Sequence, residues 1–159
     1  TSGLIVVAKN AFAQAFLQEK AEIRKFYLAI CEGIIEKDEF FIERPIGRVG
    51  DNIKREELSV ENGGQEAKTK VKVIERFPEK NLTLVELELF TGRTHQIRVH
   101  LSLEGHPILG DHLYGKENPD IKRQLLHSYK FIYTDIDTHE QKIIEIVLPD
   151  DMKNIIGVK

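Results

Sequence analysis

Residues 90–101 read Phe-Thr-Gly-Arg-Thr-His-Gln-Ile-Arg-Val-His-Leu, an apolar strand end followed by a glycine and then residues at helical spacing. The pattern predicts a strand that stops at the glycine and turns at once into a helix over residues 95–103, with Thr94 as its N-cap. A glycine and a proline follow shortly afterwards, which is typical of a helix end. Ile97 and Leu101 form an apolar pair on the face that we expect to meet the core.

The start of this helix is a candidate anion site. The first N–H groups of a helix have no partner inside it, and Arg93 lies beside them in the sequence, so a phosphate or carboxylate is favoured there. Helical spacing also places His95, Arg98 and Ser102 near one another, and an arginine on an anchored first turn is well placed to hold an anion. The alternative is an ordinary capped helix with solvated arginines.

The rest of the chain predicts a single α+β domain with a mixed, mostly antiparallel sheet and flanking helices. The apolar run over residues 3–8 predicts a buried strand. Asn10 is placed to cap a helix from residue 11 to about residue 21, and the polar stretch 47–64 predicts a mobile surface excursion. Further strands are expected at 24–30, 39–42, 67–77, 82–90, 128–136 and 142–148, with a hairpin turn at 78–81 and a last short helix from 149.

Tyr27 is the second candidate for chemistry. On the predicted strand it shares a face with Lys25 and the small Ala29, which leaves room for a nucleobase to stack and brings the phenol within reach of a proton transfer. A half-buried aromatic with only a packing role is the alternative.

Composition limits the class of protein. The 159 residues are 41% hydrophobic and 31% charged, which is typical of one globular domain, and the formal net charge of −3 does not by itself indicate nucleic acid. Residues 93–133 nevertheless carry a surplus of basic over acidic side chains, so we expect an anionic partner to bind there. Cys31 is the single cysteine, which fits a reducing compartment and a structural role. The histidine spacings do not favour a metal site, and no apolar run is long enough to cross a membrane.

An ordered series of motifs resembles the RluA-type family of RNA pseudouridine synthases. The run Thr-Gly-Arg-Thr-His-Gln-Ile-Arg at 91–98 is its most specific element, and it is similar to the family signature. The other elements occur in the expected order: Thr-Ser-Gly-Leu-Ile-Val-Val-Ala-Lys-Asn at 1–10, Lys-Phe-Tyr-Leu-Ala at 25–29, Pro-Ile-Gly-Arg at 45–48, Gly-His-Pro-Ile-Leu-Gly-Asp at 105–111 and Leu-His at 126–127.

The resemblance implies the isomerisation of uridine to pseudouridine in ribosomal or transfer RNA, without a cofactor or a metal. The target nucleotide is flipped out of its stack, and an aspartate attacks or assists at the ribose so that the glycosidic bond breaks. By position, Tyr27 matches the family tyrosine that packs on the base and is implicated in proton removal, and Arg98 matches the arginine that pairs with the catalytic aspartate. Arg93 and His95 are the candidates for contacts with the RNA backbone, on the anion-site argument. We expect a cytoplasmic protein with no obligatory protein partner.

The chain departs from the family pattern at one place. In the family the aspartate ends a His-Arg-Leu-Asp run, and two residues separate it from the Thr-Ser-Gly, so it lies three positions before the threonine, whereas this sequence starts at Thr1. Neither Asp51 nor Asp111 matches the catalytic position. Residues 1–159 are therefore expected to be the C-terminal portion of a synthase domain, inactive by themselves and with an exposed sheet edge. A buried Arg98 should then hold another anion or a neighbouring side chain.

Two other functions stay open. The chain could be a natural RNA-binding module that keeps the fold without the chemistry, although such a module has no need of an arginine placed to pair with a carboxylate. A hydrolase with an anion-binding helix is the third possibility, and it lacks a recognisable nucleophile.

Overall fold

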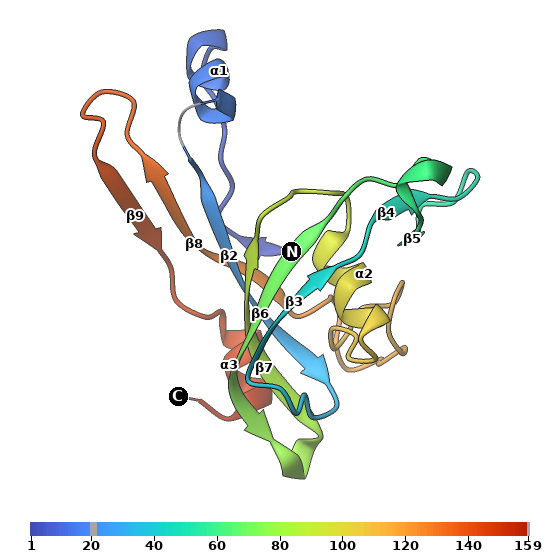
Figure 1. Cartoon of the computed structure of the whole chain (residues 1–159). Coiled ribbons are helices and arrows are strands. Elements are labelled where there is room, and N and C mark those ends of the chain that lie inside the picture. The colour runs from blue at the N-terminus through green and yellow to red at the C-terminus, as the bar shows by residue number, and fades with distance from the viewer. Residues whose placement is uncertain (20–21, 159) are drawn as a thin grey trace.

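The computed structural model describes residues 1–19 and 22–158 and confirms an α+β fold (Figure 1). A seven-stranded sheet has the order β1-β8-β2-β7-β6-β3, with β9 also paired to β8, and a separate two-stranded sheet joins β4 to β5. All pairings are antiparallel except that of β1 with β8. The elements are β1 (Ser2–Gly3), α1 (Ala11–Glu19), β2 (Arg24–Glu32), β3 (Glu39–Glu43), β4 (Ile46–Arg48), β5 (Arg55–Glu57), η1 (Val60–Asn62), β6 (Lys68–Phe77), η2 (Pro78–Lys80), β7 (Leu82–Leu89), α2 (Gln96–Leu103), β8 (Leu126–Thr134), β9 (Gln141–Glu145) and α3 (Asp150–Ile156).

The core lies where α2 and α3 pack on the middle strands of the sheet. Ile30 of β2 and Leu87 of β7 are fully buried there, together with Leu101 of α2 and Met152 of α3. Cys31 belongs to the same cluster, and burial raises the pKa of its thiol, so the structural role predicted for it is confirmed. Within the described ranges, no helix has the length and apolar character needed to span a membrane.

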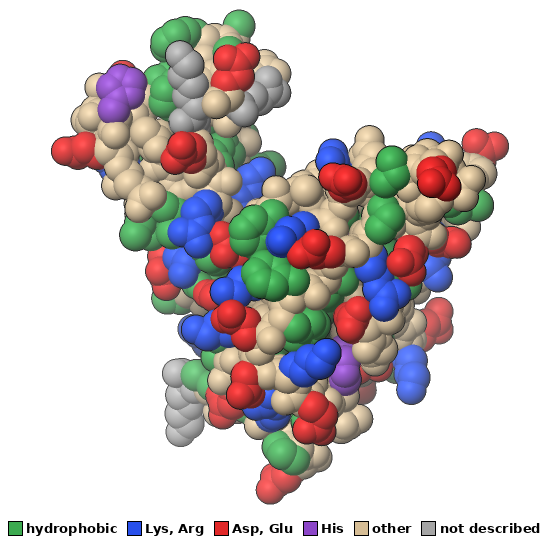
Figure 2. Space-filling view, in the orientation of Figure 1, with side chains coloured by type: hydrophobic (Ala, Val, Ile, Leu, Met, Phe, Trp, Pro, Cys, Tyr) green, Lys and Arg blue, Asp and Glu red, His purple; other side chains and the backbone are tan. Residues whose placement is uncertain are grey.

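Two lobes project from this core and leave a hollow between them (Figure 2). One lobe carries α1 and the turn between β8 and β9, where the Phe16 and His139 rings lie 6.4 Å apart. The other lobe carries β4, β5 and η1. The amino terminus lies between the two lobes, so the hollow is bordered by the first residues of the chain (Figure 1).

The predicted strand over residues 3–8 is wrong. Only Ser2 and Gly3 pair with β8, and Ile5 and Val7 are 83% and 72% exposed. The run cannot extend along β8 because β9 occupies that edge from Lys130 onward. The apolar, β-branched composition is that of a strand, but a strand needs a partner edge.

The remaining predictions hold in most places. Asn10 accepts a hydrogen bond from the Ala13 N–H at 2.8 Å and caps α1. The expected end of that helix near residue 21 lies outside the described residues. The stretch 47–64 is not an irregular excursion throughout, because it contains most of the β4–β5 hairpin and η1. The structure contains the predicted turn at 78–81, the last helix and all the other predicted strands, with shifts of one to three residues at several ends. These strands were expected at 24–30, 39–42, 67–77, 82–90, 128–136 and 142–148.

Candidate active site

A pocket of about 310 Å³ opens where β2, the turn from β7 into α2 and the start of β8 meet. All the site residues predicted from the sequence line it, namely Tyr27, Arg93, His95 and Arg98. Thr1 lines it as well, so the first described residue lies at this pocket. None of the described residues that line the pocket is acidic. The pocket therefore suits an anionic or polar ligand with a face that can pack on an aromatic ring.

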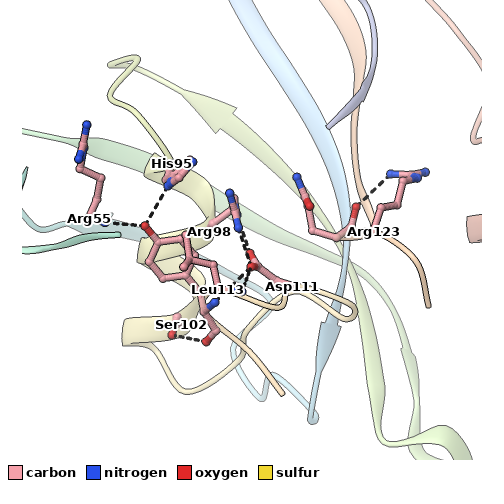
Figure 3. A network of polar contacts seen from close by, with 9 residues as sticks. Arg55, His95, Arg98, Ser102, Asp111, Leu113 and Arg123 are labelled. Atoms are coloured by element: carbon pink, nitrogen blue, oxygen red, sulfur yellow. Dashed lines mark hydrogen bonds and ion pairs between the residues drawn. The ribbon is translucent and has the colours of Figure 1, made fainter. Parts of the chain in front are cut away.

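The Arg98 side chain is held in place by the buried carboxylate of Asp111. Its Nε and Nη2 each donate a hydrogen bond of 2.7 Å to Asp111, whose side chain is completely buried (Figure 3). Burial alone would raise the pKa of the Asp111 carboxyl, but the hydrogen bonds from Arg98 and from the Leu113 and Tyr114 N–H groups outweigh it, and the pKa is lowered. The anion expected beside Arg98 is thus a neighbouring side chain, and Asp111 is too deeply buried to reach a substrate.

Tyr114 joins the residues on the first turns of α2. Its hydroxyl accepts a hydrogen bond from the Arg55 N–H at 2.7 Å and lies 3.0 Å from His95 Nδ1, while the Arg98 guanidinium stacks 5.0 Å from the ring centre. The phenol oxygen can accept from more than one N–H, so the direction of its bond to His95 follows the imidazole tautomer: with the proton on Nε2, the hydroxyl donates to Nδ1. Ser102 donates to the Tyr114 carbonyl at 3.0 Å (Figure 3). The predicted proximity of His95, Arg98 and Ser102 is therefore mediated by one tyrosine.

The same arrangement keeps His95 neutral. Burial lowers the pKa of the imidazole, and the nearby positive charges of Arg98 and Arg55 lower it further. In the tautomer with the proton on Nε2, the neutral His95 accepts from Tyr114 at Nδ1 and presents its Nε2–H as a donor. The residue is thus suited to donate a hydrogen bond to a phosphate or a carbonyl, and not to add a positive charge.

The helix start is held differently from the prediction. Thr94 is not the cap, because the N-cap is His95, with a left-handed backbone (φ 60°) and no side-chain capping bond. The Gln96 side chain holds the turn ahead of the helix instead. Its oxygen accepts hydrogen bonds from the Arg93 N–H at 3.0 Å and from the Thr91 hydroxyl at 2.8 Å. The turn that carries Arg93 into the pocket is therefore fixed by a buried glutamine.

That glutamine begins a buried chain of hydrogen bonds. Gln96 Nε2 donates to Thr69 Oγ1 at 3.0 Å, Thr69 is bonded to His100 Nδ1 at 2.9 Å, and His100 Nε2 lies 3.0 Å from the Arg44 carbonyl. A carbonyl can only accept, so Nε2 carries the proton and Thr69 donates to Nδ1. Burial, the largest influence, lowers the pKa of His100, which fits this neutral tautomer. The network ties α2 to β6 with every bond in a consistent direction.

Tyr27 is half-buried in the wall of the pocket. Burial raises the pKa of its phenol, so the group is protonated at neutral pH. Its ring offers a surface for stacking, and its hydroxyl can exchange a proton with a ligand. Within the described residues, no group of three or more His, Cys, Asp and Glu side chains could hold a metal ion.

Tyr114 and Gln96 were not among the residues predicted from the sequence, and Asp111 was predicted without a partner. Asp111 and Tyr114 lie in an irregular segment after α2, where neither helical nor strand periodicity predicts which side chains meet. The spacing of three between them, in a polar turn, was the only local signal. Gln96 lies within the run that pointed to the site, but a glutamine at a helix start has no distinctive pattern.

Comparison with known proteins identifies the family. The family model described as RNA pseudouridylate synthase matches residues 1–103. The uncharacterized RNA pseudouridine synthase YhcT of Bacillus subtilis is 44% identical over 158 residues, which cover 98% of this chain and 52% of that protein. Ribosomal large subunit pseudouridine synthase D of Nitrosomonas europaea is 38% identical, with 98% and 47% covered. The chain thus spans about half the length of these curated relatives.

The fold agrees with solved structures. Human RNA Pseudouridylate Synthase Domain Containing 1 superposes with a TM-score of 0.72 at 27% identity, over 94% of this chain and 65% of that one. Human RNA Pseudouridylate Synthase Domain Containing 4 shares the fold, with a TM-score of 0.70 at 23% identity, over 92% and 65%. The motif series, the fold and the family match over the first 103 residues agree, and the chain belongs to the RNA pseudouridylate synthase family, as its resemblance to the RluA type predicted.

Proposed function

We propose that the protein isomerises uridine to pseudouridine in structured RNA, with the target nucleotide bound in the pocket between Tyr27 and Arg98. The observation that carries this proposal is the pocket itself. The pocket is lined by the aromatic ring of Tyr27, the fixed guanidinium of Arg98 and the second guanidinium of Arg93. The chain that carries it belongs to the RNA pseudouridylate synthase family. Ribosomal or transfer RNA is the expected substrate, in the cytoplasm, without a metal, a cofactor or an obligatory protein partner.

The residues divide the reaction between them. The bond from the ribose C1′ to uracil N1 breaks, the base turns and C1′ bonds to C5. The hydrogen on C5 leaves as a proton and N1 takes one up, so the net change is an isomerisation. Tyr27 would stack on the base and take part in that proton removal. Arg93 and His95 would contact the RNA backbone, where an arginine supplies charge and a neutral imidazole a hydrogen bond.

Arg98 would orient the carboxylate of the catalytic aspartate. Its Nε and one Nη2 hydrogen are engaged by Asp111, and the remaining N–H groups are available for a second carboxylate. We propose that this carboxylate belongs to a residue three positions ahead of Thr1, because Thr1 lines the same pocket. An arginine that is already ordered keeps such an aspartate ionised without reorganising during the reaction.

Tritium release tests the proposal. The full-length protein is incubated with ribosomal and transfer RNA that carry [5-³H]uridine, because formation of the new bond at C5 sets the tritium free. We expect release from at least one of these RNAs, and a rate lower by about 10²–10⁴-fold in Tyr27→Phe, the range for a lost acid–base group. Tyr133→Phe is the matched control and should keep the full rate, because Tyr133 lies near the end of the neighbouring strand β8 and does not line the pocket. No release from either RNA would contradict the proposed function.

A further inference from the structure

A second pocket lies beside the first and is lined by arginines. Its volume is about 250 Å³, and the β4–β5 hairpin, the turn after η1 and the β7–α2 turn form its walls. Arg48 and Arg55 come from the hairpin, and Arg93 comes from the turn. Arg93 lines both pockets, so the two are neighbours across the β7–α2 turn.

The two hairpin arginines lie directly opposite each other. Arg48 pairs with Arg55 in the antiparallel register of β4 and β5. Like charges at such a position destabilise a hairpin because their Cβ atoms are only about 4.5–5.5 Å apart. Arg48 also donates to the carbonyls of Asn52 and Asp51 at 3.2 and 3.0 Å, which holds its guanidinium over the hairpin turn. The hairpin therefore keeps two positive charges together where an anion between them would relieve the repulsion.

No acidic side chain of the described part of the protein forms an ion pair with these three arginines. The lining of the pocket contains three arginines and no aspartate or glutamate, and none of the three makes an ion pair. Each of the other arginines of the chain does: Arg24, Arg44, Arg76, Arg98 and Arg123. The surface of this lobe carries side chains of both signs in Figure 2, so the unpaired charge is a property of the pocket and not of the lobe.

We propose that Arg48, Arg55 and Arg93 form a subsite for a backbone phosphate of RNA, next to the pocket that takes the target nucleotide. The choice of RNA as the ligand rests on the proposed function. Guanidinium groups bind phosphate oxygens with paired hydrogen bonds, and three of them around one cavity match the charge and shape of a phosphodiester. Because Arg93 is shared, the bound phosphate belongs to a nucleotide close to the target.

Tyr114 links this subsite to the first pocket. Its hydroxyl bonds the backbone N–H of Arg55 at 2.7 Å and His95 Nδ1 at 3.0 Å. The position of the hairpin is therefore set relative to the residues that border the target nucleotide. A phosphate held by Arg48 and Arg55 would fix the register of the RNA strand without reading its bases.

Salt-dependent binding tests the subsite. The affinity of the full-length protein for a fluorescently labelled RNA stem-loop is measured by anisotropy at several salt concentrations. We expect Arg48→Gln/Arg55→Gln to weaken binding about tenfold at ~0.15 M salt and to reduce the slope of log K against log salt by about 1.4–1.8, as for two lost phosphate contacts. The control Lys37→Gln/Lys153→Gln removes the same charge from the β2–β3 connection and from α3, neither of which lines the pocket, and should change affinity less than twofold.

Charge-preserving variants separate binding from folding. Arg48→Lys/Arg55→Lys loses the bonds to the hairpin turn but keeps both charges, so its salt slope should stay close to that of the unmodified protein. The proposed subsite is contradicted if Arg48→Gln/Arg55→Gln binds RNA with the same affinity and salt slope as the control Lys37→Gln/Lys153→Gln. It is also contradicted if Arg48→Lys/Arg55→Lys loses as much of the salt slope as Arg48→Gln/Arg55→Gln. An unmodified protein that releases no tritium, while Arg48→Gln/Arg55→Gln still loses affinity, would contradict the proposed function alone.

Discussion

The Arg98 guanidinium and the Asp111 carboxylate form a two-point ion pair, with both N···O distances at 2.7 Å and side-chain exposures of 14% and 0%. Asp111 also accepts the N–H groups of Leu113 and Tyr114, at 3.0 and 3.2 Å. A carboxylate with this many donors has a single favourable position, and so does the arginine bound to it. Arg98 is therefore oriented by the protein itself, without a ligand.

Loss of the carboxylate should be costly. Asp111→Asn leaves the Arg98 charge largely buried without an anionic partner, and we expect the free energy of unfolding to fall by about 3 kcal/mol, at the lower end for a broken buried pair. Chemical denaturation measures it. Asp150→Asn is the control, since that side chain is 91% exposed and its Lys153 partner lies 3.5 Å away, and it should change stability by less than about 0.5 kcal/mol. Equal effects of the two substitutions would show that the Arg98 pair does not stabilise the fold.

The same pair predicts a dependence on pH. The pKa of Asp111 is lowered in the folded protein, whereas an aspartate in the unfolded chain titrates near about 3.9. The stabilisation is therefore complete above that value and is lost as the pH falls through the folded pKa. We expect the stability difference between the unmodified protein and Asp111→Asn to be constant between about pH 5 and pH 7 and to shrink below about pH 4. Because His100 titrates alike in both proteins, it cancels from the difference, and a gap that persists in acid would contradict the assignment.

The sequence predicted the residues that line the pocket better than the contacts that hold them in place. Strand periodicity placed Tyr27, and the strand–glycine–helix junction placed Arg93, His95 and Arg98, because these signals are local. The pair of Arg98 with Asp111 crosses an irregular segment, and no local rule specifies such a contact. Residues 91–98 therefore identified the pocket but not what holds its arginine.

Two other elements show how tertiary context overrides local pattern. Residues 4–8 have the composition of a strand, yet β9 occupies the edge of β8 that they would need. The stretch 47–64 has the charges and glycines of a loop, yet the Ile46 N–H and C=O both bond Gln65 at 2.9 Å, and Tyr114 receives the Arg55 N–H. In each case a partner distant in sequence decided whether the stretch forms a strand.

The buried chain from Gln96 to His100 makes a third prediction. Thr69→Val keeps the shape of the side chain but removes the hydroxyl that bonds both residues, so two buried polar groups lose that partner. We expect the free energy of unfolding to fall by about 1–3 kcal/mol. Thr134→Val is the matched control, because Thr134 makes no side-chain hydrogen bond within the described ranges, and it should be nearly neutral. A stability of Thr69→Val equal to that of the control would mean that the network contributes nothing.

Tyr114 gives the last prediction, since its hydroxyl joins the β4–β5 hairpin to the first pocket. Tyr114→Phe removes the hydroxyl that lies 3.0 Å from His95 Nδ1. With the imidazole proton on Nε2, this hydroxyl donates to the neutral ring and favours it, so its loss should raise the lowered pKa of His95 toward about 6.5. The burial and the charges of Arg98 and Arg55 remain, so the pKa should stay below that value. The same substitution leaves the Arg55 N–H without its acceptor, and this amide should exchange faster with solvent. Titration and hydrogen exchange by NMR measure both effects, with Tyr133→Phe as control. An unchanged His95 pKa together with unchanged exchange at Arg55 would show that the hairpin is positioned independently of Tyr114.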